Sequence, residues 1–176
     1  NNLLVGERVD EDQFVGNNAG KTQHRGLEIG LSYNWNISKN FQLSPFLNYT
    51  LTDHSFIEFM DEGEDFSGNP LTGVPKNRST SGIQLRLFED FYWNTTLQHV
   101  SDIPLTNAAD LYSDPYSVFN TRMGYLRKLS AHFTIGVDFG INNLFDKVYA
   151  QSVLINTSGF GGSEPRYFYP GDERNY

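Results

Sequence analysis

Histidine is the residue type in this sequence best suited to bind a metal ion or a haem iron. The four histidines are His24, His54, His99 and His132. Two histidines on one face of a strand would be separated by two positions, and none of these four is. We expect His132 on the polar face of a strand, and His54 and His99 near the start of long loops, where a haem or metal ligand could sit. Because no pair has a chelating spacing, we interpret all four as ordinary polar residues and predict no metal site.

Carboxylates cluster in two predicted loops. One run comprises Glu58, Asp61, Glu62, Glu64 and Asp65, and the other comprises Asp10, Glu11 and Asp12. Clustered carboxylates can bind divalent cations, either alone or as bridges to phosphate groups. The spacing of these acids does not match a calcium-binding loop, so we interpret both runs as solvated loop residues.

The sequence lacks the patterns of common enzyme active sites. It has no cysteine, which excludes a disulfide, a thiolate zinc site and a thiol nucleophile. Gly159, Gly161 and Gly162 have no strand-to-helix context and form no dinucleotide fingerprint. No HExxH, GxSxG or phosphate-loop motif occurs, and nothing favours a glycosidase acid pair, although spacing alone leaves that pair open. We predict no catalytic or cofactor-binding residue, no cofactor and no enzymatic activity, and the net charge of −8 argues against nucleic-acid binding.

Period-two alternation of apolar and polar residues is the strongest pattern in the chain. From residue 27 to 35, and again from 131 to 141, the odd positions are apolar or aromatic and the even positions are not. Shorter or interrupted alternation occurs within Phe41–Leu51, Ile83–Leu87, Phe91–Gln98 and Phe119–Tyr125. This pattern is typical of strands with one apolar and one polar face, and helical spacing explains none of these segments.

The connections between the predicted strands alternate between short and long. Short connections lie near residues 38–40, 89–90 and 128–130, and long ones near 10–21, 54–76, 101–114 and 154–171. Many predicted strands run about 11–14 residues, enough for the roughly 9–11 tilted residues that cross hydrocarbon, and no apolar run approaches the about 18 residues of a membrane helix. The layout predicts an up-and-down transmembrane barrel with tight turns at one rim.

The two faces of the predicted barrel differ in chemistry. Aromatic residues make up 15% of the chain, and those near the tight turns would form a girdle at the membrane interface: Tyr33, Trp35, Phe41, Phe88, Phe91, Trp93, Tyr125 and Phe133. The polar face would line the lumen with Glu28, Arg86, Asn120, Arg122, His132 and Asp138. Water or a plug can satisfy these groups there, whereas a dry core would have to pair each of them.

Several segments resemble the last quarter of a TonB-dependent receptor. Residues Asn143–Tyr149 resemble the Asn-Leu-Phe-Asp-x-x-Tyr motif of the penultimate strand region in that family, and they follow the alternating segment Phe133–Ile141. Residues Pro170–Asn175 resemble the Pro-Gly-x-x-Arg segment that precedes the final strand. Asn18–Gly20 followed by Arg25–Glu28 resembles an earlier Arg-Gly-hydrophobic-Glu strand start, and Val74–Asn77 resembles the proline-containing entry to a later descending strand. The resemblance covers nearly the whole chain.

This resemblance implies an all-β fold, an antiparallel transmembrane β-barrel. The chain would supply about eight C-terminal strands of a larger barrel of about 22 strands, with the last strand truncated at Tyr176. We expect residues 1–176 to form a single C-terminal part of the barrel domain, with the plug domain absent.

The resemblance also implies a function in the bacterial outer membrane. The parent protein would be a receptor for energy-dependent uptake of a large scarce nutrient, most often a ferric siderophore or related iron complex. The implied partners are outer-membrane lipid and lipopolysaccharide, the protein's own plug domain and remaining strands, the TonB energy-coupling complex acting through the plug, and a small-molecule iron chelate. The sequence assigns no substrate-binding residue.

Two alternatives remain open from the sequence. A self-contained outer-membrane barrel of about eight strands fits the chain length, but an unpaired last strand counts against it, because a barrel must leave no edge exposed to lipid. A soluble all-β ligand-binding module is the other alternative, and its exposed aromatic faces argue against it.

Overall fold

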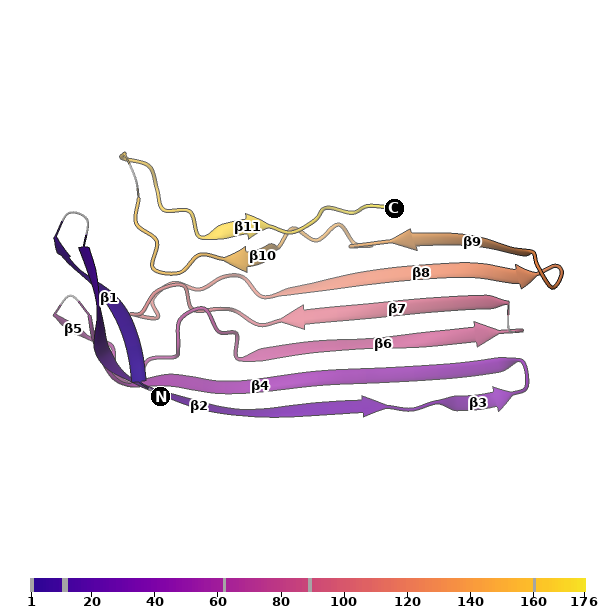
Figure 1. The fold of residues 1–176 in the computed structure, drawn as a ribbon, viewed down its shortest axis with the longest axis horizontal. Helices are drawn as coiled ribbons and strands as arrows, with labels where there is room; N and C mark the ends of the chain where they lie inside the picture. The colour runs from indigo at the N-terminus through magenta and orange to yellow at the C-terminus, as the bar shows by residue number, and fades with distance from the viewer. Residues whose placement is uncertain (1, 11–12, 62, 89, 160) are drawn as a thin grey trace.

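The computed structural model describes residues 2–10, 13–61, 63–88, 90–159 and 161–176, with side chains described from residue 20 onward. The chain folds into long antiparallel strands (Figure 1). The strands are β1 (Asn2–Asp10), β2 (Gln13–Ser32), β3 (Trp35–Ser38), β4 (Phe41–Asp61), β5 (Glu64–Asp65), β6 (Asn77–Leu87), β7 (Phe91–Val100), β8 (Tyr116–Lys128), β9 (Thr134–Ile141), β10 (Ala150–Val153) and β11 (Phe168–Pro170). Among the described residues, no helix is long and apolar enough to span a membrane.

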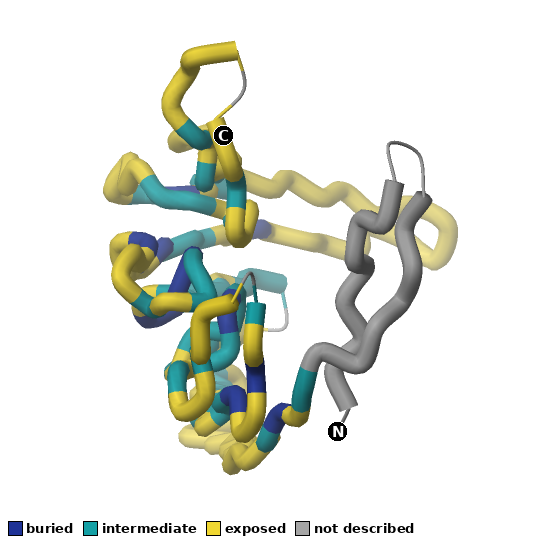
Figure 2. Tube along the Cα trace, turned by 90° about the vertical axis from the view of Figure 1, so that its left-hand side faces the viewer, coloured by how far each residue is buried: buried dark blue, intermediate teal, exposed yellow. Residues whose placement is uncertain are grey.

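The main sheet follows the order of the chain. Its strands pair as β1-β2-β4-β6-β7-β8-β9, while β3 and β5 pair with the two ends of β4. A separate pair, β10 and β11, follows β9, and one bridge joins Asn142 to Asn175. Figure 2, seen along the strands, shows the sheet bending into an arc. This up-and-down arrangement is the one predicted from the alternating connections.

The lengths of the connections agree with the prediction at the tight-turn rim. At the long-loop rim, two of the predicted loops differ from the structure. Tight turns follow β3, β6 and β8, and long loops precede β6, β8 and β11, as expected. The predicted loop at residues 10–21 is wrong, because β1 and β2 run through it with only residues 11–12 between them. The predicted loop at 54–76 is also too long, because β4 continues to Asp61 and pairs there with β5. Backbone pairing extends into segments that lack a regular alternation of apolar and polar residues, and alternation cannot reveal such strands.

The odd-numbered positions form one continuous apolar face. From Thr22 in β2 through β9, the register sets odd residues opposite odd residues, with Ile29 opposite Tyr49, Leu85 opposite Trp93 and Met123 opposite Phe139. Large side chains on this face remain exposed, including Leu31 at 59% and Val137 at 66%. An apolar surface of this extent suits contact with lipid and not with water.

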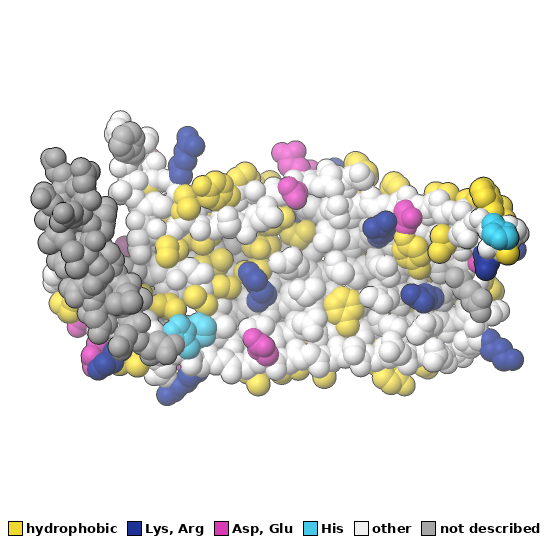
Figure 3. Space-filling model, viewed as in Figure 1, with side chains coloured by type: hydrophobic (Ala, Val, Ile, Leu, Met, Phe, Trp, Pro, Cys, Tyr) yellow, Lys and Arg dark blue, Asp and Glu magenta, His cyan; other side chains and the backbone are white. Residues whose placement is uncertain are grey.

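The even-numbered positions form a polar face on the concave side of the arc. Figure 3 looks onto this face, where uncharged groups dominate and charges of both signs are scattered. Arg122 and Asp138 form an ion pair there at 3.5 Å, and Glu28, Arg86 and Asn120 share the same register positions, as predicted. The placement of His132 on this face is wrong. It lies exposed in the turn before β9, where its backbone N–H donates to the Ser130 hydroxyl.

Aromatic rings lie over glycines on the concave face. Phe46 is directly opposite Gly82, and a Cβ added to Gly82 would lie 2.6 Å from the Phe46 ring and 2.3 Å from the Thr95 carbonyl oxygen. Tyr92 is opposite Gly124 in the same way, again at 2.6 Å. The missing side chain on one strand therefore leaves room for the ring from its neighbour, which joins adjacent strands by packing as well as by hydrogen bonds.

We expect Gly82→Ala to lower the free energy of unfolding of the intact barrel by about 1–3 kcal/mol, because the new methyl group must displace Phe46 or the strand backbone. Urea unfolding in detergent, followed by the heat-modifiable band shift, measures this. Gly30→Ala is the matched control, because its Cβ would lie at an ordinary 3.5 Å from Asn48 Oδ1. Equal losses in the two variants would contradict the packing explanation.

Candidate functional site

Long loops from three parts of the sequence meet at one end of the sheet (left in Figure 1). They comprise residues 66–76 before β6, 101–115 before β8, and the connection between β10 and β11. Asn107 lies where they meet. Its backbone carbonyl accepts from Asn69 Nδ2 at 2.9 Å, and its backbone N–H donates to Asn156 Oδ1 at 3.0 Å. One residue therefore contacts both other loops through its main chain alone.

The Asn107 side chain adds two more bonds between the loops and a third to the end of β4. Its Oδ1 accepts from the Thr72 hydroxyl at 2.8 Å and from Asn156 Nδ2 at 3.0 Å, while its Nδ2 donates to Asp61 Oδ2 at 3.3 Å. Backbone bonds run beside them, from Gly73 N–H to the Pro104 carbonyl and from Asn156 N–H to the Leu105 carbonyl. Loops held in this way present a preformed surface, which lowers the entropy lost when a ligand binds.

A small apolar core packs against these loops where they join the sheet. Val100, Tyr116 and Val118 pack together at the ends of β7 and β8, with Ile103 and Tyr149 against them, and Leu105 in the loop is completely buried. The rings of Tyr116 and Tyr149 lie 4.7 Å apart between centroids. The core therefore joins β8 to the segment that leads into β10.

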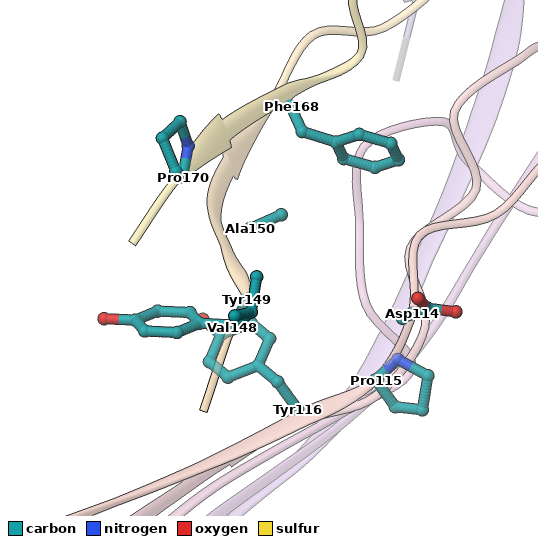
Figure 4. A pocket seen from close by; sticks show the side chains of 8 residues that line it. All are labelled: Asp114, Pro115, Tyr116, Val148, Tyr149, Ala150, Phe168 and Pro170. Atoms are coloured by element: carbon teal, nitrogen blue, oxygen red, sulfur yellow. The ribbon is translucent and has the colours of Figure 1, made fainter. Parts of the chain in front are cut away.

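An open cavity of about 250 Å³ lies beside this core. Asp114, Pro115, Tyr116, Val148, Tyr149, Ala150, Phe168 and Pro170 line it (Figure 4). The Phe168 ring extends from β11 across the cavity, and the two tyrosine rings lie together at its other side. Walls of this kind fit an apolar or aromatic part of a ligand, with Asp114 as the acidic group at the margin.

The predicted polar candidates fall into different places. His24 and His54 are opposite each other on β2 and β4, with ring centroids 4.6 Å apart. His99 faces the other side of the sheet, where its ring lies 2.9 Å from the Ser117 hydroxyl. Sequence spacing could not reveal the His24–His54 pair, because the two residues meet only through the register of neighbouring strands.

The acidic run does not form a cation site in the described structure. Glu58 pairs with Lys21 at 2.9 Å, and Asp61 accepts from Asn107. Hydrogen bonds from the Ser67 hydroxyl and backbone hold the pKa of the Asp65 carboxyl below its usual value. Glu62, Glu11 and Asp12 lie outside the described residues, as does the side chain of Asp10. Within the described part of the chain, no three His, Asp or Glu side chains gather as a metal site would require.

The two C-terminal motif segments contact each other. Asn143 is 2% exposed, and its side chain accepts from Lys147 N–H and donates to the carbonyls of Lys147 and Asp172 at 2.8–3.0 Å. Asp146 Oδ1 accepts from Arg174 N–H at 3.0 Å. Asn143 has a φ of 51°, in the left-handed region that asparagine tolerates better than most residues. The Asn143–Tyr149 motif thus acts as a turn that binds the segment around Gly171.

Comparison with known proteins decides the family. The sequence model described as "TonB dependent receptor-like, beta-barrel" matches residues 1–144. This chain belongs to that family. TonB-dependent receptors are outer-membrane transporters and not enzymes, so the predicted family, antiparallel fold, location and class of protein are confirmed. The soluble ligand-binding module is thereby excluded.

Solved structures share the fold at low sequence identity. The siderophore receptor PiuA from Acinetobacter baumannii matches at 19% identity with a TM-score of 0.69, over 98% of this chain and 23% of that one. The ferric citrate transporter FecA in its unliganded form matches at 20% identity with a TM-score of 0.69, over 97% and 26%. The ferric yersiniabactin uptake receptor FyuA from Yersinia pestis matches at 16% identity with a TM-score of 0.59, over 91% and 23%. The chain spans about a quarter of the length of these structures.

Replacing the loop-joining asparagine tests whether the loops form one unit. We expect Asn107→Ala in the intact receptor to speed hydrogen exchange at Gly73, Leu105 and Asn156, because bonds that connect the loops are lost together. Asn48→Ala on the exposed polar face is the control. Faster exchange confined to residues next to position 107 would show that the loops are independent.

Replacing the motif asparagine tests the contact between the two C-terminal motifs. We expect Asn143→Ala to lower the free energy of unfolding by about 2–4 kcal/mol, because buried partners lose their hydrogen bonds. Denaturant unfolding of the receptor in detergent measures the loss. Asn36→Ala in exposed β3 should change it little, and a similarly small effect at position 143 would contradict a structural role for the motif.

Proposed function

We propose that this chain is the C-terminal part of the barrel domain of a receptor that imports a large, scarce nutrient across the outer membrane. The ligand class we propose is a ferric siderophore or a related iron chelate. The observation that carries the proposal is that three long loops are hydrogen-bonded to one another at one end of the sheet. An aromatic cavity lies beside them, and the polar concave face extends from that end. A surface of that kind suits capture of a ligand larger than a simple ion.

The proposed mechanism divides the work between this chain and other parts of the receptor. The loops joined at Asn107 capture the ligand, and the polar concave face contacts a plug domain that lies outside residues 1–176. Ion pairs such as Arg122–Asp138 keep this face wettable, so that a plug can move against it. The TonB energy-coupling complex would act through the plug, and the apolar odd-numbered face would contact lipid and lipopolysaccharide.

Two observations favour iron chelates over other nutrients. The similar structures are named for a siderophore, ferric citrate and ferric yersiniabactin. The cavity beside Tyr116 and Tyr149 has mainly apolar and aromatic walls, which suit the organic part of a chelate better than a small hydrated ion.

A self-contained small barrel is the weaker alternative. Among the described strands, the pairing path is open, and no ladder joins β1 to β9. A barrel must close on itself, because an unpaired edge in hydrocarbon leaves backbone groups without hydrogen-bond partners. Closure of this arc by further strands of a larger barrel fits the open path.

Deletion of the gene tests the proposed transport. We expect a deletion strain grown under iron limitation to lose uptake of one radioiron-labelled ferric chelate from a panel of siderophores and ferric citrate. Uptake should return with the wild-type gene and stop when a protonophore removes the energy source. Uptake of cobalamin by the same strain serves as the control.

Two outcomes would contradict the proposal. Unchanged uptake of every ferric chelate, together with loss of cobalamin uptake, would overturn the ligand class. Uptake that continues in the presence of the protonophore would overturn energy-dependent transport.

A further inference from the structure

Two histidines lie side by side on the concave face, and the proposed uptake of an iron chelate gives this pair no role. His24 on β2 and His54 on β4 are direct cross-strand partners. Their rings lie 4.6 Å apart between centroids, with an angle of 65° between the planes. Both are even-numbered, as are the neighbouring opposed pairs Gly26–Thr52 and Glu28–Thr50, so the two imidazoles stand on the concave side.

The spacing of the rings fits a single bound metal ion. A tetrahedral ion with metal–nitrogen bonds of about 2.0–2.1 Å places two ligand nitrogens about 3.3 Å apart. The lone pair of an imidazole nitrogen points away from the ring, so each centroid lies about 3.2 Å from a bound ion, and two chelating rings have centroids about 4.5 Å apart at a ligand angle of 90° and about 5.2 Å apart at the tetrahedral angle. The observed 4.6 Å falls within this range.

A buried threonine fixes one of the rings. The Thr22 hydroxyl lies 3.0 Å from His24 Nε2, and Thr22 is 5% exposed. Histidines that bind metals commonly use their second ring nitrogen in a hydrogen bond of this kind, which sets the ring orientation. With Nε2 occupied by Thr22, Nδ1 of His24 is the atom left to coordinate.

We propose that His24 and His54 form a chelating site for one divalent transition-metal ion of the Cu²⁺, Ni²⁺ or Zn²⁺ class. Two imidazoles suit these borderline ions better than Ca²⁺ or Mg²⁺, which prefer oxygen ligands. In the described part of the chain no third His, Asp or Glu joins the pair. The ion would keep its remaining positions for water or for nitrogen and oxygen donors of an incoming molecule.

This site is independent of the proposed uptake of a ferric chelate. A ferric siderophore presents hard oxygen ligands around its metal, whereas this pair offers nitrogen to a softer ion. Failure of the transport experiment would leave the metal titration unaffected, and failure of the titration would leave the uptake measurement unaffected.

Titration of the intact receptor in detergent with Cu²⁺ or Zn²⁺ alone tests the proposal. We expect one metal ion to bind per receptor. His24→Gln and His54→Gln should each abolish binding or lower the metal affinity by more than the about 10–100-fold that is typical when a ligand loses its outer hydrogen bond. Thr22→Val should weaken it by about that smaller factor. His99→Gln and His132→Gln are matched controls, since each removes a histidine that lies away from the pair.

A second measurement keeps the test valid if a variant fails to fold. Acylation of histidines in the wild-type receptor by diethyl pyrocarbonate, read by mass spectrometry, should be slowed by Zn²⁺ at His24 and His54 and unchanged at His99 and His132. Nitrogen hyperfine structure from two imidazoles in the Cu²⁺ spectrum would support the site. Equal metal affinity in the wild type and both pair variants, or equal protection of all four histidines, would overturn it.

Discussion

The pairing of each long strand from β1 to β9 with the next long strand in the sequence is the constraint on which the rest of this structure depends. In hydrocarbon there is no water to satisfy backbone N–H and C=O groups, so each strand must find its partners in the next. From Thr22 in β2 through β9 this pairing keeps odd residues opposite odd residues. A single parity therefore separates the face that meets lipid from the face that meets the lumen. The antiparallel order places the turns after β3, β6 and β8 at one rim and the long loops before β6 and β8 at the other.

Side-chain amides join segments at two places where the strand ladder ends. At the long-loop end, side-chain amides replace ladder hydrogen bonds, and Asn107 joins segments that are up to 49 residues apart in the sequence. After β9, the Asn143 turn and the Asp146–Arg174 contact do the same for the C-terminal segment. In both places an asparagine, half-buried at position 107 and buried at position 143, uses its donors and its acceptor together, because an amide can satisfy carbonyls and N–H groups at one point.

The sequence predicted those features of the fold that depend on one strand face meeting lipid and the other meeting water. Alternation revealed the membrane-crossing parts of β2, β4 and β6–β9 and the polar positions Glu28, Arg86, Asn120, Arg122 and Asp138, because lipid and water impose opposite demands on neighbouring residues. It failed for β1 and the outer part of β2, where apolar alternation is lacking, and for His132, where the pattern runs on into a turn. Asn107 and the His24–His54 pair left no local signal, since both depend on contacts between distant segments.

The separation of faces by parity also bears on how the barrel reaches its register during assembly. Hydrogen bonds alone discriminate poorly between alignments shifted by one residue, but such a slip turns every side chain of a strand to the opposite face. For β8 it would move Arg122, near the middle of the strand, from the lumen into hydrocarbon, at a cost of about 2–4 kcal/mol at the bilayer midplane. The bilayer therefore disfavours misaligned strands, because a wrong register transfers lumen-facing charges into hydrocarbon at a cost in free energy.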